Sequence, residues 1–449
     1  MAARAQWPLT AALLALCAMI GMLAGTAPAV AIGAGVMAAF AALVAADLTL
    51  GLCVFIVVAF AERLPAAGFS DLTLVKALGA LLAVSWLATV ATRRAGERQL
   101  FTAHPVMSAA GALLLAWMIL SVGWAEDPAV AREYVMRYAL NFALLPIVYT
   151  AVQRREHVVA VMSVYVGSAV AAALYGMFTV GDDYESLGRI SGLVGTANEL
   201  ASVLVTAMFL AGGLLLALKG SPLLRTLCFS AIAICLVGLF LTQSRAGLIA
   251  LGTALFAAVV VGGRRRFVVA VLVTLVSITT VGYFAFIATD EVRHRVTTFG
   301  SGTGRTDIWT VAWRMVQDEP VRGIGVGNFQ TASIHYLLQP GAILRDEFIV
   351  DRPQITHNSY LNVLSETGVV GLTLFCVILA AGFFACWRAA DEFRRRGDPF
   401  LEACARAVSL ALIALFVADV FASDQLNKEL WVLLGLGPAL LAIARGERA

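Results

Sequence analysis

The sequence RFVVAVLVTLVSITTVGYFAFIAT at residues 266–289 is followed by a polar segment, residues 290–356, and then by HNSYLNVLSETGVVGLTLF at residues 357–375. Both flanking runs are long enough, as helices, to cross the roughly 30 Å hydrocarbon core of a bilayer. The polar segment between them is far longer than a turn between two such helices needs. This arrangement predicts a membrane protein with a functional site at the water interface, where the chain returns to the membrane.

The composition excludes several classes of protein. Of the 449 residues, 60% are apolar and 14% are charged, and the mean hydropathy is +0.87. A soluble protein of this size could not cover so much apolar surface. The net charge of +3 and the scattered arginines provide no nucleic-acid footprint. The seven cysteines form no CxxC pair and no Cys/His cluster, so we expect neither a metal site nor a disulfide in the polar segment.

The repeated apolar runs predict an all-α polytopic membrane protein with about 12–14 transmembrane helices and one large loop carrying amphipathic helices. The expected spans are 9–26, 28–46, 48–61, 72–92, 106–124, 134–152, 158–180, 196–218, 224–242, 245–263, 266–289, 358–388, 403–421 and 428–444. The run at 48–61 is short and could be re-entrant, so 12 spans fit as well as 14. We expect an N-terminal transmembrane bundle (1–289), a large loop (290–356) and C-terminal transmembrane helices (357–449).

Basic residues in the short loops predict the orientation, because they gather on the cytoplasmic side of membrane proteins. One set of alternate connections carries Arg93, Arg94, Arg98, Arg154, Arg155, Lys219, Arg225, Arg264, Arg265, Arg266, Arg388, Arg394, Arg395 and Arg396. The opposite connections hold single basic residues. Both termini are therefore expected in the cytoplasm, and the large loop outside. Ala27-Pro28-Ala29 resembles a signal-peptidase site, but an uncleaved first span is favoured because further apolar runs follow at once.

The large loop has internal order. Residues 307–318, DIWTVAWRMVQD, place their apolar side chains on one helical face, which predicts an amphipathic helix on the membrane or on the bundle. Pro320 ends this helix, and the glycines at 323, 325 and 327 predict a flexible turn. The glycine spacing is superficially that of a phosphate-binding loop, but no strand and no GK[ST] accompany it.

Four residues on the outward side are candidates for chemistry, because charged groups at the rim of a membrane are costly. Arg189 could equally pair with Asp183 or Glu185 in its own loop. Arg245 lies in a very short outward turn, where a lone basic residue runs against the charge rule. Arg305 begins the amphipathic helix, although its Gly-Arg-Thr-Asp context also suits a helix cap. Rim arginines otherwise contact lipid head groups.

The fourth candidate is His357, which stands at a helix N-terminus. The helix dipole and nearby arginines both disfavour imidazolium, so the ring is expected to be neutral near pH 7 and able to accept a proton. His294 and His335 in the same loop are rivals. The acids Glu366 and Asp419, with Lys76, are expected to form a structural charge network that supports the site.

Several short motifs, in order, resemble the O-antigen ligase and polymerase superfamily. His357-Asn358, then nine residues, then Gly368-x-x-Gly371 resembles the family's signature. The preceding motifs are Gly188-Arg189, Thr196-Ala197-Asn198, Gln243-Ser244-Arg245-Ala246-Gly247, Gly304-Arg305 with Trp309, and Pro320 to Phe329. The resemblance covers roughly residues 188–372; the first 180 residues match only as generic spans.

The resemblance implies a glycosyltransferase of the bacterial inner membrane, acting on the periplasmic side. The family moves a glycan from a polyprenyl diphosphate, usually undecaprenyl diphosphate, to an acceptor hydroxyl, which in ligases belongs to a lipid A-core sugar. Arg245 and Arg305 would bind the diphosphate with help from Arg189, and His357 would deprotonate the acceptor, with inversion and without metal or cofactor. Arginine contacts can replace a metal at a diphosphate.

Three other functions remain open from the sequence. A polymerase of the same superfamily differs only in its acceptor. A secondary transporter, from another class, usually has two related halves and broken helices near the midplane, and no matching halves are visible here. A protein-glycosylating transferase is the third.

Overall fold

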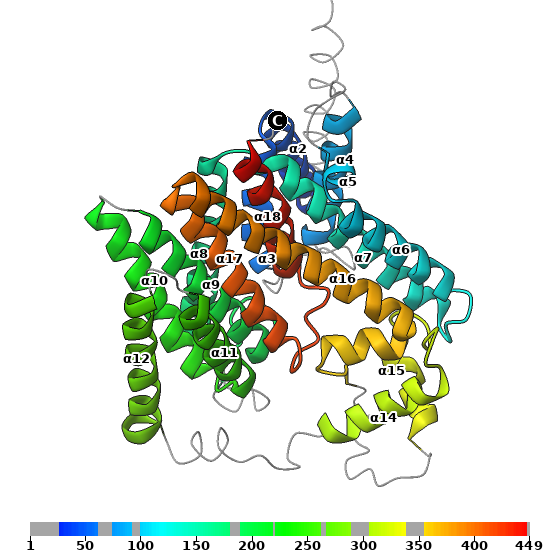
Figure 1. The fold of residues 1–449 in the computed structure, drawn as a ribbon. Coiled ribbons are helices and arrows are strands. Elements are labelled where there is room, and N and C mark those ends of the chain that lie inside the picture. Colours follow the sequence, from blue (N-terminus) through cyan, green and yellow to red (C-terminus); the bar gives the residue numbers. More distant parts are fainter. Residues whose placement is uncertain are drawn as a thin grey trace, which may run out of the picture.

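The computed structural model describes residues 27–61, 74–91, 99–179, 189–218, 221–261, 266–288, 305–337 and 354–446. Every regular element within these ranges is helical (Figure 1). The elements are α2 (Pro28–Ala46), α3 (Leu48–Phe60), α4 (Leu74–Ala91), α5 (Leu100–Ala103), α6 (Pro105–Ser121), α7 (Pro128–Ala151), α8 (Arg155–Phe178), α9 (Ala197–Ala217), α10 (Pro222–Leu241), α11 (Arg245–Val261), α12 (Arg266–Gly282), the π-helical turn η2 (Tyr283–Ile287), α14 (Arg305–Asp318), α15 (Phe329–Ala332), the 3₁₀ turn η4 (Ser333–Tyr336), α16 (Ser359–Arg396), α17 (Pro399–Ala418) and α18 (Lys428–Arg445).

The long helices begin and end close to the expected apolar runs. Among the described residues, five helices are long and apolar enough to cross a membrane, namely α8, α9, α10, α16 and α17. Six further apolar helices have 10–17 residues. The all-α polytopic fold class is therefore confirmed. The expected span at 9–26 lies outside the described residues.

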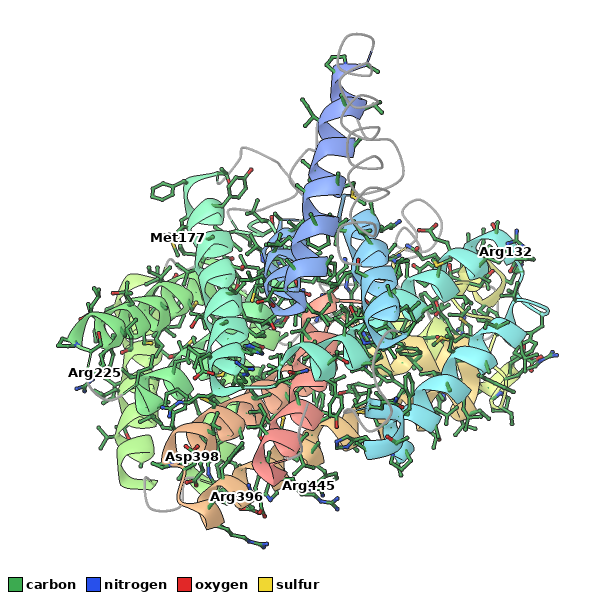
Figure 2. The ribbon with its side chains drawn as sticks, turned by 90° about the horizontal axis from the view of Figure 1, so that it is seen from above. Arg132, Met177, Arg225, Arg396, Asp398 and Arg445 are labelled. Carbon is green, nitrogen blue, oxygen red and sulfur yellow. The ribbon has the colours of Figure 1, made fainter. Side chains whose placement is uncertain are left out.

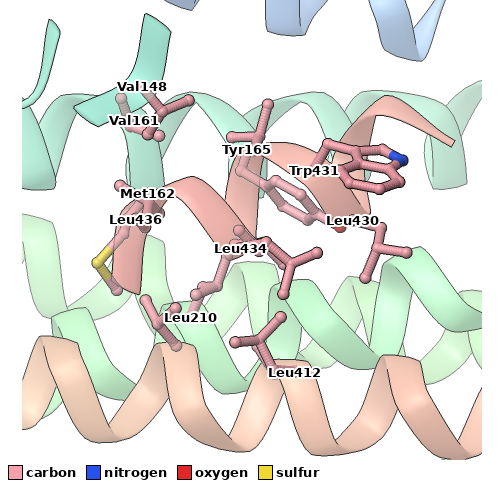
Figure 3. Close-up of a cluster of buried hydrophobic side chains, with 14 of the residues drawn as sticks. Val148, Val161, Met162, Tyr165, Leu210, Leu412, Leu430, Trp431, Leu434 and Leu436 are labelled. Carbon is pink, nitrogen blue, oxygen red and sulfur yellow. The ribbon is translucent and has the colours of Figure 1, made fainter. Parts of the chain in front are cut away.

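The core of the bundle forms around α9, against which α8, α10, α11 and α17 pack. A helix enclosed on this many sides is apolar all round rather than amphipathic. Figure 3 shows part of this core, where α7, α8, α9, α17 and α18 contribute buried side chains. The labelled members are Val148, Val161, Met162, Tyr165, Leu210, Leu412, Leu430, Trp431, Leu434 and Leu436.

Helix α16 is not continuous, because its backbone breaks at Gly368, where φ is 67° and ψ is −173°. This conformation is essentially restricted to glycine. A Cβ atom at this position would also collide with the carbonyl group of Val321. The amide of Val369 donates to the carbonyl of Pro320 at 2.9 Å. The segment from the large loop therefore packs directly against the break in α16.

The break leaves carbonyl groups of α16 without helical partners, and the glycine-rich turn supplies donors to them. The amide of Ile324 donates to Ser365 O at 3.0 Å, and that of Gly325 donates to Glu366 O at 2.9 Å. The indole of Trp117 donates to Thr367 O at 2.9 Å. Irregular backbone at membrane depth is tolerated where protein satisfies it. The turn at 323–327 is thus a structural support for α16.

The functional candidates gather at one end of the bundle, which we call the His357 end. It comprises residues 189–196, the C-terminal end of α10, the N-terminal ends of α9, α11, α16 and α18, the connection 419–427 and helix α14. Long-range hydrogen bonds join its parts: the amide of Ile190 donates to Leu241 O at 3.3 Å, and the hydroxyl of Ser202 donates to Asp424 Oδ2 at 3.2 Å.

Candidate functional site

The turn between α10 and α11 carries Arg245, and Arg189 braces that turn. The guanidinium of Arg189 donates from Nε to Thr242 O at 2.8 Å and from Nη2 to Asn198 Oδ1 at 3.2 Å. The hydroxyl of Ser244 donates to the same Asn198 oxygen at 2.9 Å. Arg189 therefore lies beside the turn that contains Arg245, and these bonds hold the turn in one conformation.

Asn198 itself is placed by the first turn of α9. Thr196 is the N-cap of this helix: its hydroxyl accepts from the amide of Glu199 at 3.2 Å, and Glu199 Oε2 accepts from the amide of Thr196 at 2.9 Å. This reciprocal pair is a capping box, which satisfies two otherwise orphaned donors. The segment 196–198 thus serves to present Asn198 to Arg189 and Ser244.

Helix α14 brings Arg305 to the site. Its apolar face, with Ile308, Val311 and Met315 buried, packs against α15, the glycine-rich turn and α16. The amphipathic helix expected at 307–318 is therefore present and rests on the bundle. The indole of Trp309, one turn after Arg305, donates to Thr356 O at 2.8 Å. This bond fixes α14 to the segment that bears His357.

His357 occupies a constrained position before α16. Its φ is 50°, in the left-handed region that non-glycine residues rarely adopt. Asn358 is the N-cap of α16 and accepts from the amide of Leu361 at 2.9 Å. The hydroxyl of Thr356 is within 3.0 Å of both Asn362 Oδ1 and Ser423 Oγ. Hydrogen bonds on both sides therefore hold the backbone of His357.

The connection 419–424 is hydrogen-bonded to Ser359, the first residue of α16. The amide of Ser359 donates to Asp419 O at 2.8 Å and to Ala422 O at 2.9 Å, while the amide of Asp424 donates to Ser359 Oγ at 2.8 Å. Burial raises the pKa of the Asp424 carboxyl above its usual range. A raised pKa favours the uncharged carboxyl, which does not stabilise a protonated His357.

Electrostatics link three of the four candidates. Burial lowers the pKa of Arg305, and the positive charge of Arg245 lowers it further. Burial lowers the pKa of His357 to about 4, with the positive charge of Arg305 as the second cause. Arg245, Arg305 and His357 thus come from three separate segments, and Arg305 lies within electrostatic range of both Arg245 and His357. The imidazole is neutral at pH 7, as a proton acceptor must be.

The other titratable residues considered from the sequence have different surroundings. His335 is exposed, and its Nε2 lies 2.8 Å from Glu126 Oε1; His294 lies outside the described residues. Glu366 is buried, and its Oε1 accepts from the amide of Phe329 at 3.3 Å. Lys76 pairs with Glu133 at 3.3 Å.

Sequence patterns identified only some of the residues whose hydrogen bonds position the candidate site. Thr356, Ser359 and Ser423 have no pattern that marks them, because the partners that connect them to the rest of the site are 6 to 67 positions away. Within the described ranges, no group of three or more His, Cys, Asp or Glu side chains is placed to hold a metal ion. The charged groups that converge are arginines, which suit an anionic ligand.

Comparisons with known proteins match this part of the chain. Residues 230–376 match a family model described as O-antigen ligase. This range contains Arg245, Arg305 and His357, and it excludes Arg189. The chain is also 25% identical over 328 residues to a Pseudomonas aeruginosa protein named O-antigen ligase, covering 73% of this chain and 74% of that protein.

Proposed function

We propose, from the similarity of this chain to O-antigen ligases, that it is an inverting, metal-independent O-antigen ligase. Its donor would be a glycan on undecaprenyl diphosphate, and its acceptor a hydroxyl of a lipid A-core sugar. The observation that carries this proposal is the association of Arg245, Arg305 and a neutral His357 at one end of the bundle. The distribution of basic residues in the sequence predicts that this end faces the periplasm.

The arginines suit the departure of a diphosphate. This leaving group is already stable as an anion and needs no acid to protonate it, but its negative charge must be neutralised. Guanidinium groups stay charged at any relevant pH and bind phosphate oxygens in pairs. Arg245 and Arg305 would contact the diphosphate directly, and their mutual repulsion would be relieved when it binds. Arg189 would hold the turn that presents Arg245 and add positive charge.

His357 suits the activation of the acceptor. A neutral ring nitrogen would take the proton of the acceptor hydroxyl as its oxygen attacks the anomeric carbon of the donor. The new carbon–oxygen bond forms as the bond to the phosphate oxygen breaks, and undecaprenyl diphosphate leaves with that electron pair. Attack opposite the leaving group inverts the anomeric configuration. Proton transfer by a positioned base of this kind contributes typically about 10²–10⁴-fold to a rate.

An apolar cavity supports a lipid-linked donor. It has a volume of about 250 Å³ and lies between α9, α10, α11, α12 and α17. Leu251, Leu255 and Ala258 line it, and they follow Arg245 along α11. A polyprenyl chain whose diphosphate lies at Arg245 would pass along α11, and a part of it would fill this cavity.

Removal of the proposed base tests the mechanism. We expect His357→Ala to reduce glycan transfer by about 10²–10⁴-fold while donor binding is retained. Arg245→Ala should weaken donor binding as well. His335→Ala is the matched control, because that exposed histidine is paired with Glu126. Undiminished transfer by purified His357→Ala protein would defeat the assignment.

The acceptor is tested in cells. In a deletion strain, loss of ligated chains together with accumulation of carrier-linked polymer would support a ligase. A lipid A core that carries a single repeat unit would instead identify a polymerase.

A further inference from the structure

A second, polar cavity lies at the His357 end, with a volume of about 180 Å³. Its walls come from α7, α9, the loop before α15, the N-terminal part of α16 and the connection 419–427. The lining side chains that the argument uses are Tyr134, Arg137, Gln425 and Asn427, with the carboxyl groups of Glu199 and Glu366. The donor-binding arginines proposed above are not among its lining residues.

The cavity contains a buried hydrogen-bond acceptor with no donor. Gln425 is only 3% exposed, and its Oε1 has no hydrogen-bond partner among the described residues. A buried polar atom left in this state costs free energy, and such atoms in native proteins commonly meet a ligand or ordered water. Asn427, the N-cap of α18, makes no side-chain capping bond, so its amide is also available to the cavity. Both side chains suit the hydroxyl groups of a sugar.

The charges in the cavity favour a neutral ligand. Arg137 lies over the ring of Tyr134, 5.0 Å from its centroid. Two carboxyl groups face this single cation, and both are engaged: Glu199 accepts from the amide of Thr196, and Glu366 from that of Phe329. A phosphate would gain no net attraction here, in contrast to the Arg245–Arg305 pair. A volume below the roughly 300–1,000 Å³ of drug-sized sites suits one sugar ring.

The wall of this cavity is the segment that carries His357. Ile355 lines the cavity, and the hydroxyl of Thr356 is hydrogen-bonded to Asn362 and Ser423, which line it too. A sugar ring held here is therefore one or two residues along the backbone from His357. The acceptor sugar would therefore lie on a side of the candidate site that Arg245 and Arg305 do not line.

We propose that this polar cavity binds one uncharged sugar ring of the acceptor, adjacent to the ring whose hydroxyl reaches His357. This rests on the proposed function, since the cavity selects the acceptor for the same transfer. Gln425 and Asn427 are positioning residues in this account, because they would hold the acceptor without touching the reacting atoms. The face of Tyr134 offers an apolar surface to the ring.

Acceptor titration at saturating donor tests the proposal. Asn427→Ala and Gln425→Leu should each raise the acceptor KM at least tenfold, with kcat within about threefold and donor binding unchanged. A merely structural role would lower kcat and the melting temperature instead. The matched control is Gln317→Ala, an exposed amide on α14. Asn427→Ala is the cleaner variant, since the amide group of Gln425, whose Oε1 is unpaired among the described residues, also donates to Tyr138.

Direct binding separates this proposal from the proposed function. A delipidated, dephosphorylated core oligosaccharide should bind the wild-type protein in calorimetry and bind Asn427→Ala at least tenfold more weakly, whether or not transfer occurs. Absence of transfer by the wild type would defeat the ligase assignment alone. Equal oligosaccharide affinity in wild type, Asn427→Ala and Gln425→Leu would overturn the cavity assignment, as would displacement of the oligosaccharide by inorganic phosphate.

Discussion

Two non-glycine residues in the described part of the chain have positive φ, and both belong to the candidate site. Gln243 and His357 each have a φ of 50°. Such conformations cost about 1–3 kcal/mol and persist where the surroundings enforce them. Around Gln243 the enforcing contacts are those of Arg189 and Ser244; around His357 they are those of Thr356 and Asn358. The strain therefore falls on the residues that set the positions of Arg245 and the imidazole.

The pH dependence of transfer should report the low pKa of His357. As the proposed base, His357 would act in its neutral form, and its pKa is about 4. The kcat/KM profile, which reflects free enzyme, should thus be flat near neutrality and fall as pH drops through about 4. Arg305→Gln removes one of the two causes of the low pKa, so the acid limb should move to higher pH. A pH series of kcat/KM for both proteins measures this shift.

The control for this series is Arg322→Gln, because Arg322 is exposed and paired with Glu319. Its acid limb should coincide with that of the wild type. A wild-type limb near the ordinary histidine pKa of about 6.5 would contradict the expected environment. An Arg305→Gln limb that does not move would show that the positive charge at residue 305 does not act on the imidazole.

Among the elements, α14 acts on the site through one indole hydrogen bond. Trp309→Phe keeps an aromatic ring but removes the donor to Thr356 O. We expect a loss of about 0.5–1.5 kcal/mol in stability for the bond and a reduction of transfer of roughly tenfold or more, because small displacements of reacting groups are costly. Trp313→Phe, on the exposed face of the same helix, should leave transfer unchanged. Equal activities of these two variants would refute a positioning role for α14.

The break in α16 gives a second prediction at this scale. Gly368→Ala should destabilise the protein by about 1–3 kcal/mol for the backbone conformation, with a further cost for the contact with Val321. Gly252→Ala is the matched control: it lies within α11, and a Cβ atom there meets nothing within 4 Å. The control should be neutral or slightly stabilising. Thermal unfolding in detergent compares the two, and similar melting temperatures would contradict the role of Gly368.

The helices could be predicted from the sequence far better than the hydrogen bonds that position the candidate site. The run expected at 428–444 is α18 at Lys428–Arg445, because a long apolar run between polar loops favours a helix. The expected run at 358–388 is also a helix, but its break at Gly368 was not foreseen. That break depends on donors from the glycine-rich turn, which lie about forty residues away. Periodicity describes local order and contains no information on such contacts.

At the scale of the whole molecule, the two ends of the bundle differ in how their basic residues are distributed. Figure 2 shows Arg396, Asp398 and Arg445 close together at its lower edge, where α16 and α18 end and α17 begins. The last turn of α16 alone contains Arg394, Arg395 and Arg396. The His357 end instead holds single arginines within a hydrogen-bonded site. This division is the pattern that the positive-inside rule associates with a cytoplasmic and an external side.

The orientation can therefore be tested with two exposed positions, one on each end. In a variant without its native cysteines, Gln317→Cys on α14 should react with a membrane-impermeant maleimide added to intact spheroplasts. Arg395→Cys, at the end of α16, should react only after the membrane is permeabilised. The side chains at residues 317 and 395 are both exposed, so the two positions differ only in the side of the membrane that they are expected to face. Labelling of Arg395→Cys but not Gln317→Cys in intact spheroplasts would put the site in the cytoplasm. The proposed transfer to a periplasmic acceptor would then be impossible.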